Sequence, residues 1–120
     1  MTFNQTNQNA GNVNNDLSIM AKVCQQISEQ HGFYEPPWNF GEKIALMHSE
    51  LSEALEDHRK NKHLEPDEHC PKFNKLEVEF ADVIIRVLDT CGYMALDIGG
   101  AVEAKIAFNR SRPHKHGKSY

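Results

Sequence analysis

The segment from Lys72 to Thr90 constrains the fold of this chain more than any other. Its sequence, KFNKLEVEFADVIIRVLDT, contains no proline or glycine and is mostly apolar. On a helical wheel its apolar residues cover an arc of roughly 220°. The narrow stripe that remains is polar and consists of Lys75, Glu79, Asp82, Arg86 and Asp89. A helix this apolar packs against neighbours on most sides, so we expect it to be the central element of a helical domain.

Three further segments show the apolar periodicity of amphipathic helices. The expected helices run from an N-cap at Asn15 to Gln30, from Gly41 to Lys60, and from an N-cap at Asp97 to Arg110. Gly92 suits the position just after the end of the central helix. No segment of any length alternates as a strand does, so the predicted fold class is all-α, a small four-helix bundle.

Composition divides the chain into three parts. Residues 1–15 are rich in Asn and Gln and predict a flexible arm, residues 16–112 predict the helical domain, and residues 113–120 form a basic tail. A domain of this size buries only a modest core, and the wide apolar arc of its central helix exceeds what two neighbours would cover. We therefore expect a homodimer or a dimer of dimers.

Charge and cysteine usage bear on partners and location. From residue 42 to 82, acids outnumber Lys and Arg eleven to six, and only the tail is basic, so a nucleic-acid partner is not expected. The three cysteines lack the spacing of a disulfide framework. No apolar run approaches the length of a membrane span, and no apolar signal region begins the chain. These features predict a cytoplasmic protein without a membrane partner.

Two pairs of carboxylates carry the chemical signal. Glu50 and Glu53 lie three residues apart in the second expected helix, and Glu79 and Asp82 repeat that spacing in the central one. Residues at i and i+3 share one helix face. Considered without the second pair, Glu50, Glu53 and Asp57 are typical of a solvated surface opposite the apolar stripe of their helix.

The central helix leaves two interpretations open. Glu79 forms an intrahelical ion pair with Lys75 or Arg86, or two antiparallel helices bring all four carboxylates into one cleft. Four like charges repel unless a cation neutralises them, and oxygen ligands suit Mg²⁺ or Mn²⁺. Magnesium held by carboxylates commonly serves phosphate chemistry.

At this point the sequence resembles the MazG-like all-α nucleoside triphosphate pyrophosphohydrolases. Their signature is an E-x-x-E motif, a spacer and an E-x-x-D motif. It stands here as ELSE at 50–53, 25 intervening residues, and EFAD at 79–82. The stretch WNFGEKIALMHSELSEAL resembles the family's second helix, and KIAFNRSRPHKHGK resembles its K-x-x-x-N-x-x-R ending. The resemblance covers residues 38–118.

The resemblance implies a function and a set of site residues. Members cleave nucleoside triphosphates between the α and β phosphates, which predicts a house-cleaning pyrophosphohydrolase acting on a standard or modified (d)NTP. The residues that match the magnesium ligands are Glu50, Glu53, Glu79 and Asp82. Some relatives carry one more glutamate directly before the first motif, where this chain has Ser49. The general base is then Glu50 or Glu53, and the sequence does not choose between them.

The basic end of the chain supplies candidate substrate contacts. Lys105, Asn109 and Arg112 recur on one helix face and match the family's phosphate- or sugar-facing positions, and Lys118 extends them. The alternative is that these cations only offset the helix dipole. Trp38 either stacks a base or caps the core at a loop.

No P-loop or dinucleotide-binding motif is present, and His63, His69 and Cys70 fit no zinc spacing well. Two alternative functions stay open: a phosphoribosyl-ATP pyrophosphohydrolase on a related scaffold, and a non-catalytic helical module that binds nucleic acid through the basic tail.

Overall fold

The computed structural model describes residues 13–35 and 37–114, and the regular secondary structure of these residues is helical, with no strand. They form four α-helices: α2 (Val13–Gln30), α3 (Phe40–Arg59), α4 (Lys75–Tyr93) and α5 (Ile98–Ser111). The predicted all-α class is confirmed. The proposed arm up to residue 12 and the end of the tail, residues 115–120, lie outside the described residues. None of the described helices is long and apolar enough to cross a membrane.

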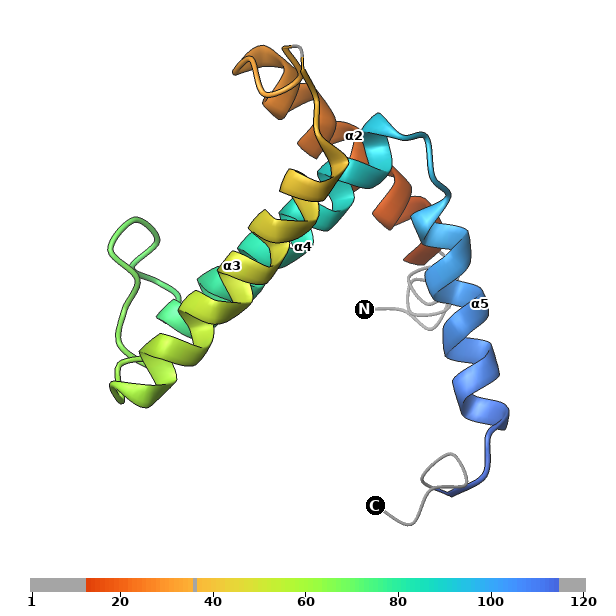
Figure 1. Ribbon diagram of the computed structural model, residues 1–120. Helices are drawn as coiled ribbons and strands as arrows, with labels where there is room; N and C mark the ends of the chain where they lie inside the picture. The colour runs from red at the N-terminus through yellow and green to blue at the C-terminus, as the bar shows by residue number, and fades with distance from the viewer. Residues whose placement is uncertain (1–12, 36, 115–120) are drawn as a thin grey trace.

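The four helices do not close into one bundle. α3 and α4 lie side by side as an antiparallel pair, and α2 packs on α4 near the end of that pair (Figure 1). α5 packs on α2 and diverges from the pair, so the shape is open. The radius of gyration is 17.3 Å, whereas a compact domain of this length has about 14 Å.

Side-chain caps set the helix starts. Asn39 accepts a hydrogen bond from the Glu42 amide at the start of α3, and Asp97 caps α5 as predicted. α4 begins at Lys75, three residues later than expected, because Asn74 and Glu77 form a reciprocal capping box. The predicted cap Asn15 is wrong, since α2 already begins at Val13.

The position predicted for Gly92 is also wrong, because this glycine lies inside α4, which ends at Tyr93. A β-carbon on Gly92 would lie 2.6 Å from the backbone oxygen of Ala21 in α2. The glycine therefore permits close packing of two helices instead of ending one.

The core of the single chain is small. Among the described residues the buried hydrophobic side chains are Ala21, Ala54, Leu88 and Cys91. On α2 the apolar residues Met20, Val23 and Ile27 are about half exposed. Much apolar surface of every helix thus remains open in one copy of the chain.

The orientation of α3 differs from the predicted one. Glu50 is buried at 7% exposure and faces α4, while Leu51 and Leu55 of the expected apolar stripe are about half exposed. Glu50 therefore belongs to an interhelical surface, and its interpretation as part of a solvated face is wrong, whereas Glu53 on the same side is exposed. Small Ala54, buried beside Glu50, lets the two helices approach at this face.

Candidate metal centre

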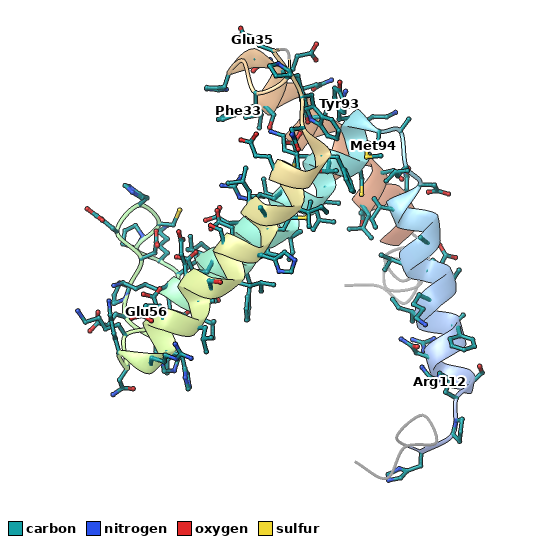
Figure 2. The ribbon with its side chains drawn as sticks, in the orientation of Figure 1. Phe33, Glu35, Glu56, Tyr93, Met94 and Arg112 are labelled. Carbon is teal, nitrogen blue, oxygen red and sulfur yellow. The ribbon has the colours of Figure 1, made fainter. Side chains whose placement is uncertain are left out.

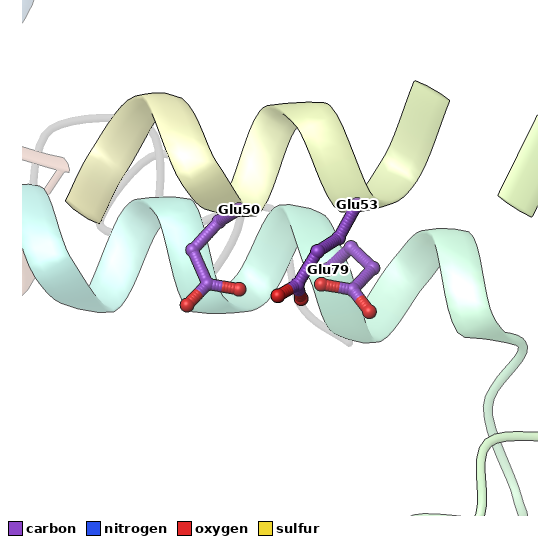
Figure 3. A group of neighbouring side chains, drawn as sticks. All are labelled: Glu50, Glu53 and Glu79. Carbon is purple, nitrogen blue, oxygen red and sulfur yellow. The ribbon is translucent and has the colours of Figure 1, made fainter. Parts of the chain in front are cut away.

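Three carboxylates meet between α3 and α4. Glu50 and Glu53 come from α3 and Glu79 from α4, and one carboxylate oxygen of each lies within 4.8 Å of the others (Figure 3). The i, i+3 spacing turns the first two toward α4 together, and the antiparallel pairing brings Glu79 opposite them. Within the described residues no other group of three or more His, Cys, Asp or Glu is close enough to share an ion, so His63, His69 and Cys70 form no such site.

The charges of this trio are poorly compensated. The pKa of Glu79 is raised from 4.5 to about 7, first by burial, then by its hydrogen bond with Glu53 and by the charges of Glu53, Glu50 and Asp57. Its Oε2 atom is buried and has no hydrogen-bond partner. Near neutral pH the trio therefore holds a proton that a cation would displace.

Arg86 is the cation beside the trio. Its Nε donates to Oε1 of Glu50 at 2.8 Å, linking α4 to α3. The alternative in which Glu79 pairs with Lys75 or Arg86 within the helix is not found, because Lys75 pairs with Glu65 and Arg86 with Glu50. Within the described residues Glu79 has no cation at ion-pair distance.

Asp82, the fourth predicted ligand, lies outside the trio. Its pKa is raised by burial and by the charge of Glu50, and lowered by Arg86. It lines an adjoining pocket one turn along α4 from Glu79. The structure thus brings three of the four predicted carboxylates together and places the fourth beside them.

The adjoining pocket has a volume of about 310 Å³ and lies between α2, α3 and α4. Its lining residues are Ser28, Phe33, Glu42, Lys43, Leu46, Asp82, Ile85, Arg86, Asp89 and Thr90. Asp89 accepts hydrogen bonds from the Ser28 hydroxyl at 2.7 Å and from the Tyr34 hydroxyl. Burial raises the pKa of Asp89, and the Ser28 bond opposes that rise. The pocket is large enough for part of a small organic molecule and continues the polar stripe of α4.

Trp38 takes part in an aromatic stack. Its ring stacks on Tyr93 at 4.5 Å between centroids, and Tyr34 stacks on Tyr93 at 4.4 Å. Tyr93 lies at the end of α4 where the chain leading to α3 passes (Figure 2). The stack attaches that loop to α4, which agrees with the interpretation in which Trp38 caps the core at a loop. The buried Nε1 of Trp38 has no hydrogen-bond partner.

The predicted phosphate contacts are not at the trio. Lys105 and Asn109 lie on α5, which contacts α2, and Arg112 follows its last residue. Arg112 lies at the far end of α5, well apart from Glu56 of α3 (Figure 2). Lys105 and Arg112 both lie over the ring of Phe108. Lys118 falls outside the described residues.

Several residues near the trio were not predicted as site residues. Arg86 stands on the same polar stripe as Glu79, at i+7, and that spacing is a signal that could have identified it. Phe33 and Lys43 line the pocket from a loop and from the first turn of α3, and they also approach each other, with the ammonium 5.9 Å from the ring centre. No periodicity in the sequence indicates them.

A divalent cation fits the donor set of the trio. The ligands are all carboxylate oxygens, as Mg²⁺ and Mn²⁺ prefer, and Oε2 of Glu79 lacks a partner that an ion would provide. No protein-family model, curated protein or solved structure matches this chain. The resemblance to MazG-like pyrophosphohydrolases therefore stands on the two motifs.

Proposed function

We propose that this protein is a Mg²⁺-dependent nucleoside triphosphate pyrophosphohydrolase that releases a nucleoside monophosphate and pyrophosphate. The observation that carries the proposal is the carboxylate trio, in which Glu79 has a pKa of about 7 and an unpartnered buried oxygen. Such a trio disfavours its own charge and favours a cation. Nucleotide-pool cleaning is the role that the family resemblance suggests.

The carboxylate trio and the adjoining pocket would bind different parts of the substrate complex. The ion would be held by Glu50, Glu53 and Glu79. Asp82 lies beside them and would bind the ion through a water molecule or after a change of rotamer. When bound, Mg²⁺ neutralises phosphate charge and acidifies a water molecule. Mn²⁺ would substitute, since it takes the same oxygen ligands. Arg86 and Lys43 line the pocket, and they would contact phosphate oxygens as charge-assisted donors.

The trio also favours one of the two candidate bases. Glu50 is buried, and its Oε1 atom is already engaged by the hydrogen bond that it accepts from Arg86. Glu53 is exposed, so a water molecule can reach it, and it lies in hydrogen-bond contact with the carboxyl group of Glu79. We therefore assign Glu53 the role of accepting the proton of the attacking water. Positioning and charge neutralisation supply the rest of the rate enhancement.

The test is pyrophosphate release from a panel of NTPs, dNTPs and phosphoribosyl-ATP with Mg²⁺. Glu53→Gln keeps the side-chain shape and removes a charge, and we expect it to lower turnover at least about 100-fold. The matched control is Glu56→Gln, one turn along α3, where the glutamate is 51% exposed and pairs with Lys60 at 3.4 Å. Turnover of the control should stay within about twofold of wild type.

Other outcomes would redirect the assignment. Release of single phosphate would place the cleavage at another bond and contradict the proposal. Hydrolysis of phosphoribosyl-ATP alone would favour that related enzyme. No turnover on any substrate, together with salt-dependent nucleic-acid binding that survives Glu53→Gln, would favour a binding module that uses the basic end.

A further inference from the structure

The pocket beside the carboxylate trio contains an acidic group that the proposed metal chemistry does not use. This group is Asp89, which lines the pocket together with Asp82 and Arg86 of the same helix. The three residues stand at i, i+4 and i+7, so they share one face of α4. The rise of the helix from Asp82 to Asp89 is about 10 Å. Asp89 therefore lies at the end of the pocket away from the trio.

The Asp89 carboxylate is held in place by two hydroxyl groups from other parts of the chain. The Ser28 hydroxyl of α2 donates to its Oδ2 atom at 2.7 Å, and the Tyr34 hydroxyl donates to its Oδ1 atom. A carboxylate oxygen can accept two hydrogen bonds, so one acceptor site remains on each oxygen. Within the described residues no Lys, Arg or His lies at ion-pair distance from this carboxylate. Asp89 thus presents two adjacent acceptors in a fixed plane.

Apolar side chains line the same pocket. Phe33 and Ile85 are 62% and 47% exposed, and Leu46 of α3 lines the pocket with them. Figure 2 shows Phe33 toward the end of α4 that carries Tyr93. An accessible aromatic ring can stack on a nucleobase, and a volume of about 310 Å³ is at the lower limit of small-molecule sites. A flat ring with a polar edge, such as a nucleobase, therefore suits this end of the pocket.

A carboxylate distinguishes the nucleobases by the donors at their edges. Guanine presents its N1–H group and its N2 amino group side by side, and these match the two oxygens of one carboxylate as a bidentate pair. In adenine and cytosine the amino group stands next to a ring nitrogen that is an acceptor, and in uracil and thymine the N3–H group stands between two carbonyl oxygens. Each of these acceptors would face a carboxylate oxygen with no proton between them, which is unfavourable. An ionised carboxylate therefore selects guanine.

We propose that Asp89 determines the base specificity of this protein, and that its carboxylate binds the N1–H and N2 amino groups of a guanine nucleotide in the pocket. Phe33 stacks on one face of the base, and Ser28 and Tyr34 are positioning residues that hold the carboxylate in its plane. The inference rests on the proposed function, because phosphates bound beside Glu79 leave the base at the Asp89 end of the pocket. The substrate class is then a guanine (d)NTP, or a modified guanine (d)NTP that keeps both donors.

The test is isothermal titration calorimetry of the full chain with the monophosphates of guanosine, inosine, adenosine, cytidine and uridine, because their binding needs no hydrolysis. Inosine lacks only the N2 amino group of guanosine. We expect the wild-type dissociation constant for guanosine monophosphate to be at least about tenfold lower than that for inosine monophosphate, since inosine leaves one oxygen of Asp89 unpaired. Phe33→Ala should weaken the binding of every monophosphate about tenfold and leave their order unchanged.

Asp89→Asn tests the carboxylate while keeping its shape. The amide presents one acceptor and one donor, so it matches xanthine, which has a carbonyl oxygen in place of the N2 amino group of guanine. The hydroxyls of Ser28 and Tyr34 can rotate to accept from the amide. We expect guanosine monophosphate to bind at least about tenfold more weakly and xanthosine monophosphate to bind at least about tenfold more tightly than to wild type. The matched control Asp16→Asn, at an exposed position in the first turn of α2, should keep the wild-type order.

Several results would overturn the base assignment. They are equal wild-type affinities for the guanosine and inosine monophosphates, a preference for another base, no binding of any monophosphate at about 1 mM, or an unchanged guanine preference in Asp89→Asn. If Asp89→Asn loses its helical circular dichroism, the wild-type order and Phe33→Ala decide the question. The proposed function fails separately: guanine-specific binding without pyrophosphate release would reject the hydrolysis alone, and equal pyrophosphate release from every (d)NTP would reject the base assignment alone.

Discussion

The Glu79→Gln substitution should stabilise the metal-free protein, although it removes a charge from a partly buried site. Glu79 has a pKa of about 7 in the folded chain, against an ordinary value of 4.5. Folding therefore favours its protonated form, and this contribution to stability is complete below about pH 4.5 and is lost as pH rises through about 7. Glutamine keeps the neutral shape at every pH and avoids that loss.

The magnitude follows from the same two values. The difference between 4.5 and about 7 corresponds to ~3 kcal/mol at full strength. Glu79 is partly exposed, so solvent screening reduces this to ~1–2 kcal/mol. For a domain of this size we expect the Tm of Glu79→Gln in EDTA at about pH 8 to exceed that of wild type by ~3–10 °C. At about pH 5 the two proteins should melt within ~2 °C of each other.

Thermal melts followed by circular dichroism, with EDTA or with Mg²⁺, measure both parts of this prediction. Added Mg²⁺ at tenfold its dissociation constant should stabilise wild type by ~1.4 kcal/mol and Glu79→Gln much less. The control Glu103→Gln, an exposed residue of α5, should follow wild type in every buffer. A lower Tm of metal-free Glu79→Gln at about pH 8 would refute the reasoning from like charges.

Two further predictions concern the packing of α4. Arg86→Met leaves Glu50, which is 7% exposed, without its cation, and should lower the free energy of unfolding in urea by ~2–3 kcal/mol. The control Lys60→Met removes an exposed pair with Glu56 and should change that free energy by less than ~0.5 kcal/mol. Equal losses in the two variants would show that the Arg86–Glu50 pair is unimportant. Gly92→Ala should lower the same free energy of unfolding by ~2 kcal/mol, because its β-carbon would meet the Ala21 oxygen at 2.6 Å. The control is Gly41→Ala, where the nearest atom lies at 3.3 Å from the added β-carbon. Stabilisation by Gly92→Ala would mean that α2 and α4 move apart freely.

The sequence predicts the helices well because their signals are local. Apolar periodicity and the cap at Asp97 depend on residues within a few positions of one another, and both were confirmed. The prediction that Gly92 follows the end of α4 was wrong because glycine suits a helix end and also a close helix crossing. Only the position of the second helix distinguishes the two. The capping box that starts α4 could have been predicted from Asn74 and Glu77, which are three residues apart.

The candidate site was predictable where helix geometry alone fixes it. The i, i+3 spacing brings Glu50 and Glu53 together on any helix, and pairing with α4 adds Glu79. The face on which these acids lie was not predictable from α3 alone, because Leu51 and Leu55 satisfy the same periodicity as a core stripe. Whether an apolar stripe is a core or an interface depends on the partner that covers it, which the pattern does not contain.

The cost of the trio in stability is itself an argument for a ligand. A domain of 120 residues has a total stability of roughly 6–18 kcal/mol, and this one buries few apolar side chains. Repulsion of ~1–2 kcal/mol at Glu79 is then a considerable fraction of what holds the fold together. Glutamine in its place would relieve the repulsion with no change of shape. A purely structural helix pair gains nothing from the excess of three carboxylates over one arginine, whereas a site that exchanges a proton for a cation near neutral pH requires the repulsion among the carboxylates.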